Sequence, residues 1–216
     1  MTDITREIQI AFVGDEGVGK TSIIMRIDQQ EFQDDLSHSC GCTFTPINLK
    51  FNHDNSIETI EITNCDIVWD GNDRKDNFLD KVFQDSSAFA IVFDPSNVLF
   101  DNEDLENWLN PIKEKAPHAI IALVRNKSDL TANGRFNEDS LKKLANNYEA
   151  MYFITSAQKN EGIIELYEGL INKITGLNGN LELIKENENE KTESINIENE
   201  SKEKIIIKRK KRWCCC

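Results

Sequence analysis

The sequence lacks a long apolar run and a leader of the secretory type. The longest apolar stretch, 87–93, is far shorter than the ~20 residues that a membrane-spanning helix needs. The segment 1–7 has neither the basic start nor the apolar centre of a signal peptide. These absences predict a chain that stays in the cytosol, where thiols are kept reduced.

Positive charge is also scarce. The 25 Lys and Arg residues are outnumbered by 38 Asp and Glu residues, so the formal net charge is −13 and the pI is about 4.7. An acidic body argues against general nucleic-acid binding, and we expect no nucleic-acid partner. One basic run, Lys208 to Arg212, departs from this balance. It is either part of a solvated tail or a contact for an anionic surface.

The six cysteines do not have the spacing of a disulfide framework. Three of them end the chain as Cys214, Cys215 and Cys216. Adjacent side chains at a terminus cannot converge on a zinc ion without strain. This terminal cluster therefore points to a chemistry other than cross-linking or metal binding.

Apolar patterning predicts strands that alternate with helices. The expected strands are 8–13, 47–51, 57–62, 88–93, 119–124 and 152–154, and the expected helices are 21–30, 105–112, 141–145 and 163–174. This alternation predicts an α/β fold, with a mostly parallel six-stranded sheet and helices on both faces. From about residue 177 Glu, Asn and Lys dominate, which is typical of a flexible linker. We therefore expect a domain at 1–176 and a tail at 177–216.

A phosphate-binding motif follows the first expected strand and opens the first expected helix. Its residues fit G-x-x-x-x-G-K-[ST] in full: Gly14, Asp15, Glu16, Gly17, Val18, Gly19, Lys20 and Thr21. Backbone N–H groups of such a loop bind phosphate, and the helix N-terminus adds positive potential. Lys20 is expected to reach the β- and γ-phosphates, and the Thr21 hydroxyl to ligate Mg²⁺.

A second motif indicates which base the nucleotide carries. Asn126-Lys127-Ser128-Asp129 stands at the carboxyl end of a buried strand, where open α/β sheets bind ligands. A carboxylate here accepts hydrogen bonds from the ring N–H and the amino group of guanine, a donor pair that adenine lacks. A third element, 155–158, follows the last strand, and its backbone N–H groups are placed to bind the guanine carbonyl.

These three motifs, in this order, resemble the Ras superfamily of small GTPases, most closely its Rab branch, over about residues 8–174. The resemblance implies a P-loop G domain that binds GTP or GDP with Mg²⁺. It implies that Asn126 supports the loop and base, Lys127 packs over the purine and Asp129 reads guanine. It further implies that Ala157, between Ser156 and Gln158, caps the guanine carbonyl. Phe32 stands where the family often has an aromatic against the base, although a place in the core explains it equally well.

The two switch regions depart from the family pattern. Ser39 is the best-spaced hydroxyl for Mg²⁺ in switch I, and Thr43 is the alternative. For the switch II D-x-x-G motif, chain length favours Asp66, the Trp-Asp pair favours Asp70 with Gly71, and hydrophobic register favours Asn64. None of these registers is followed by a glutamine, so the group that orients the attacking water is absent and hydrolysis is expected to be slow.

The C-terminus resembles a Rab-type prenylation signal. A C-a-a-X box would need Cys at the fourth position from the end, where Trp213 stands. Clustered terminal cysteines instead resemble substrates of the escort-protein-dependent geranylgeranyl transferase, which usually modifies two. The sequence does not say which two of Cys214, Cys215 and Cys216 these are.

Two functions from different classes remain open. The first is a Rab-like trafficking switch on the cytoplasmic face of an intracellular membrane, with a cytosolic pool. By resemblance it implies an exchange factor, a GTPase-activating protein, an escort protein and a GDP-dissociation inhibitor. The second is a nucleotide-binding scaffold that acts through partners without useful hydrolysis. The compartment and the effectors are not encoded in these motifs.

Overall fold

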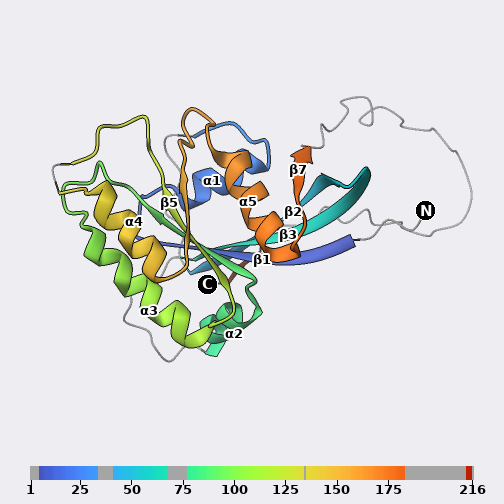
Figure 1. Cartoon of the computed structure of the whole chain (residues 1–216), viewed down its shortest axis with the longest axis horizontal. Helices are drawn as coiled ribbons and strands as arrows, with labels where there is room; N and C mark the ends of the chain where they lie inside the picture. The colour runs from blue at the N-terminus through green and yellow to red at the C-terminus, as the bar shows by residue number, and fades with distance from the viewer. Residues whose placement is uncertain (1–4, 34–40, 68–76, 134, 183–212, 216) are drawn as a thin grey trace, which may run out of the picture.

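The computed structural model describes residues 5–33, 41–67, 77–133, 135–182 and 213–215, whose arrangement is shown in Figure 1. The strands are β1 (Thr5–Val13), β2 (Cys42–His53), β3 (Ser56–Ile67), β4 (Ala88–Phe93), β5 (Ile120–Arg125), β6 (Met151–Ile154), β7 (Gly179–Glu182) and β8 (Trp213–Cys215). The helices are α1 (Lys20–Ile27), α2 (Asn77–Asp85), α3 (Glu106–Lys115), α4 (Glu138–Asn147) and α5 (Ile163–Thr175), with a 3-10 turn η1 (Asn102–Leu105) before α3.

The described strands form one sheet in the order β6-β5-β4-β1-β3-β2-β7, and β8 also pairs with β2. The pairs from β6 through to β3 are parallel, whereas β2 runs antiparallel to β3, β7 and β8. The mostly parallel α/β fold is thus confirmed. The sheet has two strands beyond the six expected, because β7 and β8 from the C-terminal part of the chain add to β2.

Helices cover both faces of the sheet and enclose two apolar layers. On one face Ile23 of α1 and Tyr167 of α5 are fully buried against the strands. On the other face Phe83 of α2, Leu109 of α3 and Leu141 of α4 form the second layer. Within the described residues, no helix combines the length and the apolar character that crossing a bilayer requires.

Strand β3 ends at Ile67, not at Ile62 as expected from the sequence. The polar residues after Ile62 suggested a loop, but Asn64 and Asp66 are buried inside the strand. The hydroxyl of Tyr167 donates a hydrogen bond to Asn64 Oδ1 at 2.7 Å, which satisfies that buried amide. Partners from other elements therefore allow polar residues to extend this strand.

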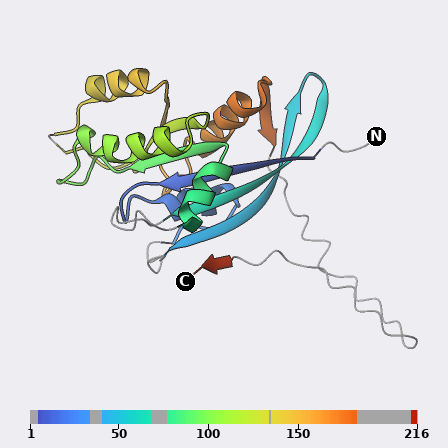
Figure 2. The same cartoon turned by 90° about the horizontal axis from the view of Figure 1, so that it is seen from below.

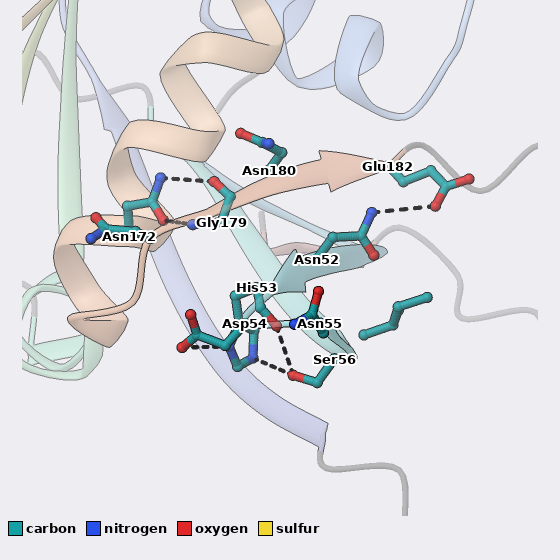
Figure 3. A pocket seen from close by; sticks show the side chains of 11 residues that line it. Asn52, His53, Asp54, Asn55, Ser56, Asn172, Gly179, Asn180 and Glu182 are labelled. Atoms are coloured by element: carbon teal, nitrogen blue, oxygen red, sulfur yellow. Dashed lines mark hydrogen bonds and ion pairs between the residues drawn. The ribbon is translucent and has the colours of Figure 1, made fainter.

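The chain beyond residue 176, which we assigned to the tail, first adds β7 to the edge of β2. Strand β7 pairs with 50–53, and Asn172 holds its first residue through two hydrogen bonds (Figure 3). These are Asn172 Nδ2 to Gly179 O at 3.0 Å and Gly179 N to Asn172 Oδ1 at 2.8 Å. Glu168 Oε1 accepts a third hydrogen bond, from the N–H of Leu181. Composition did not predict β7, because main-chain pairing with β2 and the packing of Leu181 against the core hold it, and both depend on the tertiary structure.

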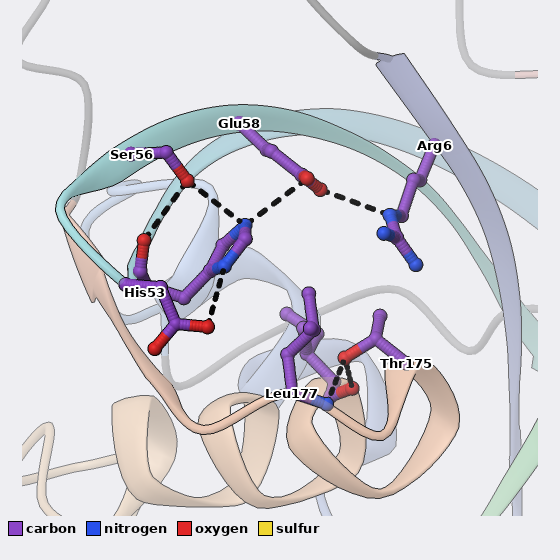
Figure 4. A network of polar contacts seen from close by, with 8 residues as sticks. Arg6, His53, Ser56, Glu58, Thr175 and Leu177 are labelled. Atoms are coloured by element: carbon purple, nitrogen blue, oxygen red, sulfur yellow. Dashed lines mark hydrogen bonds and ion pairs between the residues drawn. The ribbon is translucent and has the colours of Figure 1, made fainter.

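A buried polar network fixes the turn between β2 and β3 (Figure 4). Glu58 is buried, accepts a hydrogen bond from Arg6 Nε at 2.9 Å and lies 3.0 Å from His53 Nε2. The hydroxyl of Ser56 donates to the carbonyl of His53 at 2.9 Å. Between this turn and β7 lies an open polar cavity of about 800 Å³. Both features lie at the amino ends of the parallel strands, away from the motif loops.

Candidate nucleotide-binding site

The motif loops meet at the carboxyl edge of the parallel strands. The register places Val13 beside Ile91, Phe93 beside Arg125 and Arg125 beside Ile154. The segments that leave these strands therefore emerge side by side. This is the edge of an open α/β sheet at which ligands bind.

The phosphate-binding loop depends on glycine at two positions. Gly14 has φ +134°, and a Cβ there would lie 2.1 Å from the carbonyl oxygen of Val92. Gly19 has φ +97°, and a Cβ there would lie 2.3 Å from Asn126 Nδ2. Gly19 caps helix α1 and has no side chain to bond the first-turn N–H groups. The loop thus presents backbone N–H groups and the positive end of a helix, which suits a phosphate.

Lys20 lies under this loop and is nearly completely buried. Its Nζ donates hydrogen bonds to the carbonyl oxygens of Gly14 and Asp15, both at 2.8 Å. Burial lowers the pKa of Lys20, although the nearby carboxylates of Asp66, Asp15 and Glu16 act to raise it. A phosphate placed beside this buried ammonium would favour its charged form.

Thr21 and Asp66 meet at the start of α1. The Thr21 hydroxyl donates a hydrogen bond to Asp66 Oδ2, although the two residues lie far apart in the chain. Of the three candidates for the D-x-x-G aspartate, Asp66 alone is described beside the phosphate loop, since Asn64 instead bonds Tyr167. Asp70 falls outside the described residues.

Asn126 ties three loops together. Its Nδ2 donates to the carbonyl of Val18 at 2.9 Å, which links it to the phosphate loop. Its Oδ1 accepts from the Thr155 hydroxyl at 3.1 Å and from the N–H of Ala157 at 3.2 Å. Because Asn126 is only 1% exposed, these bonds satisfy a buried amide and hold the phosphate and base motifs in one rigid arrangement.

The two charged residues of the N-K-x-D motif have partners at the surface of the site. Asp129 Oδ1 accepts a hydrogen bond from the Ser156 hydroxyl. Lys127 has φ +56°, and its Nζ lies 2.8 Å from Asp94 Oδ2. Burial would raise the pKa of Asp94, but hydrogen bonds from Lys127 and Ser96 hold it below its ordinary value. The serine orients the Asp129 carboxylate, and the ion pair restrains Lys127.

Sequence reasoning missed two residues that shape the site. Arg26 donates from Nε to the carbonyl of Ala157 at 2.7 Å and from Nη2 to that of Gln158 at 3.0 Å. Its guanidinium also lies 5.5 Å from the ring centroid of Phe32. No local pattern marks Arg26 as a residue of the site, because Ala157 and Gln158, whose carbonyl groups it binds, lie more than 130 positions away. The position of Asp94 in the sequence could have indicated that it belongs to the site, since it directly follows the predicted strand 88–93.

The other predicted site residues divide by position. Asp15, Glu16 and Gly17 form the exposed tip of the phosphate loop. The switch I candidate Thr43 lies in β2, and Cys214 and Cys215 lie in β8. Besides Asp70, three predicted residues fall outside the described part of the chain: Ser39, Gly71 and Cys216.

Comparison with known proteins shows the family to which the chain belongs. A family model described as the Ras family matches residues 9–176. The GTP-binding protein YPT53 of Saccharomyces cerevisiae is 28% identical over 179 residues, which cover 79% of this chain and 77% of YPT53. Ras-related protein Rab-22A of Mus musculus is 27% identical over 179 residues, covering 81% of this chain and 87% of that protein. Ras-related protein Rab-31 of Rattus norvegicus is 29% identical over 183 residues, covering 81% and 89%. The chain therefore belongs to the Ras family, and Rab proteins match it over most of its length.

Proposed function

We propose that this protein is a Rab-like switch that binds GTP and GDP and acts in membrane trafficking. The observation that carries the proposal is the side chain of Asn126. Its hydrogen bonds link Val18 of the phosphate-binding loop to Ala157 of the loop 155–158. The loops that we assign to the phosphates and to the guanine base are therefore held in fixed positions relative to each other. Family membership and the Rab relatives support the same function.

The described residues fit a nucleotide with its magnesium ion. We assign phosphate binding to the loop from Gly14 to Thr21, and base recognition to Asp129, Ala157 and their neighbours. The Thr21 hydroxyl and the Asp66 carboxylate are oxygen donors, the kind that Mg²⁺ prefers, and they already lie together. The described residues contain no cluster of three or more His, Cys, Asp or Glu side chains able to hold a metal. Mg²⁺ at nucleotide sites is commonly held by one or two protein groups together with phosphates. When bound, Mg²⁺ neutralises charge that develops on the phosphates during hydrolysis.

We propose further that hydrolysis is slow, because a glutamine follows none of the switch II candidates. A nucleotide-binding scaffold without useful hydrolysis is the second candidate, and the same missing glutamine favours it. Lys20, Thr21 and Asp129 would serve either function. The two functions differ in the rate at which bound GTP is hydrolysed.

We propose that geranylgeranyl groups on two of the terminal cysteines anchor the protein to the cytoplasmic face of an intracellular membrane. The support is the terminal Cys214, Cys215 and Cys216 cluster after the basic run 208–212. Two prenyl chains hold a protein stably on a bilayer, whereas one holds it marginally. A cytosolic pool then needs a partner that shields the lipids, and the family resemblance implies such partners, together with exchange and GTPase-activating factors.

Base selectivity tests the proposed function directly. We expect the wild-type protein to bind GTP and GDP far more tightly than ATP in competition. Asp129→Asn should weaken GTP binding by roughly a hundredfold or more and improve binding of xanthosine triphosphate, which carries a carbonyl in place of the guanine amino group. Asp139→Asn, at an exposed position of helix α4, is the matched control. Equal affinity for ATP and GTP would remove the basis of the proposal.

A further inference from the structure

Strand β2 has two different neighbours on the side away from β3. Near its end, residues 50–53 pair with β7, and at its start, residues 42–44 pair with β8 (Figure 2). The β8 register is antiparallel, with Cys42 opposite Cys215 and Phe44 opposite Trp213. Residues 213–215 thus form a strand on the sheet of their own domain.

The chain is long enough for this pairing. Strand β7 ends at Glu182 and β8 begins at Trp213, so roughly 30 residues with an extended reach of about 100 Å connect them. The two pairing sites on β2, at Phe44 and Lys50, lie only about 20 Å apart along the strand. Closing this loop requires no stretching of the chain. Its entropic cost rises only slowly with loop length.

Charge and residue type favour the same contact. The basic run 208–212 directly precedes β8, and the protein as a whole carries a formal net charge of −13. Long-range attraction therefore draws the end of the tail toward the acidic body. Trp is enriched in strands, and no proline interrupts 213–215.

The pairing of β8 with β2 covers part of a sheet edge that another strand could otherwise occupy. An edge strand offers unpaired N–H and C=O groups on which another strand can form. Strand β2 starts at Cys42, directly after the predicted switch I segment that contains Ser39. Any partner that adds a strand to this end of β2 competes with β8 for the same main-chain groups.

We infer that the C-terminal strand Trp213–Cys215 is an intramolecular ligand of β2 that masks the sheet edge at Cys42–Phe44 until the cysteines are modified. Lipid groups on residues of β8 belong in a bilayer, and insertion draws this strand away from the domain. Attachment to a membrane thereby opens the edge of β2. This release step rests on the proposed lipidation, whereas the docking of β8 does not.

Hydrogen exchange of segment 41–47 in the unmodified full-length chain tests the docking. Successive N–H groups of a strand point to opposite sides, so Trp213→Pro with Cys214→Pro removes a ladder donor whichever one faces β2. The matched control, Trp213→Thr with Cys214→Val, keeps both backbone N–H groups and the strand-forming character. A third variant ends at Arg212.

We expect exchange in segment 41–47 to become roughly tenfold faster in the double-proline and truncated chains, and to stay slow in the wild type and the control. The variants alter only the end of the tail, so the folded domain serves as an internal reference. Equal exchange in all four chains would overturn the docking. Loss of protection in the control as well would overturn the assignment to main-chain pairing.

The release is tested with a chain whose mass shows added prenyl groups, bound to anionic phosphatidylcholine–phosphatidylserine vesicles. We expect its segment 41–47 to exchange as fast as that of the truncated chain. Persistent protection on the vesicles would overturn the release. A mass without prenyl groups after exposure to the transferase and its escort protein would count against the proposed lipidation alone, and the docking result would stand.

Discussion

The Thr21 hydroxyl donates a hydrogen bond to the carboxylate of Asp66, and this contact joins the start of α1 to the end of β3. The pairing of β1 with β3 sets it up, since Asp66 lies beside Phe12 in the register and thus next to the start of the phosphate loop. Asp66 is almost completely buried. A buried carboxylate beside a hydroxyl that is expected to ligate Mg²⁺ is well placed to orient the ion and its waters.

Asp66→Asn should therefore weaken Mg²⁺-dependent nucleotide binding by roughly tenfold to a hundredfold, the range typical of groups that orient metal ligands. The asparagine keeps the size of the side chain and removes its charge. Titration of GDP affinity against Mg²⁺ measures the effect. Asp54→Asn, at the exposed β2–β3 turn with φ +45°, is the control. An unchanged Mg²⁺ dependence in the Asp66 variant would exclude this role.

Intrinsic hydrolysis should be at or below the ~10⁻⁴ s⁻¹ scale of unassisted small GTPases, because no glutamine follows the switch II candidates. Single-turnover hydrolysis of preloaded GTP measures this rate. The bound nucleotide should be identified beforehand. A rate far above this scale in the absence of a partner would mean that another residue orients the attacking water, and Asp66 and Asp70 would be the first to substitute.

Replacing Cys214, Cys215 and Cys216 together by Ser should release the protein from membranes and leave nucleotide affinity unchanged. Each buried CH₂ of a prenyl chain contributes about 0.8 kcal/mol, so loss of both chains abolishes stable attachment. Fractionation of cells measures the distribution. Neutralising Lys208 to Arg212 is the comparison, and it should weaken attachment without abolishing it. Unmodified cysteines in the C-terminal peptide of the membrane-bound pool, seen by mass spectrometry, would contradict the prediction.

Tyr167→Phe should destabilise the fold by about 1–3 kcal/mol, because it leaves the buried Oδ1 of Asn64 without its hydroxyl donor. Urea unfolding measures the change in free energy, with an unchanged m-value as a check that the transition stays two-state. Tyr148→Phe is the matched control, since its hydroxyl bonds Asn110 at the surface. A decrease in the free energy of unfolding no larger than that of the Tyr148→Phe control would show that water readily replaces the Tyr167 hydroxyl.

Local patterns were enough to predict most strands and helices of the domain and the motifs between them. A buried strand such as 88–93 is apolar throughout, and the glycines of the G-x-x-x-x-G-K-T loop have positive φ values, a local property of the backbone that favours glycine. Helix α2 was missed although Leu79, Val82 and Phe83 recur in the sequence with helical spacing. The length of β3 was misjudged because the buried state of Asn64 depends on Tyr167, which lies 103 positions away.

The sequence by itself determined the fold class, the phosphate and base motifs and the cysteine terminus, because each rests on residues that are neighbours in the chain. Only the tertiary structure decided that Asp66, rather than Asn64, lies against Thr21. It further decided that Arg26 binds the loop 155–158 and that Asp94 pairs with Lys127. It also decided that β7 and β8 add to β2. These contacts join segments far apart in the sequence, and their formation depends on the register and packing of the whole sheet, which no local pattern encodes.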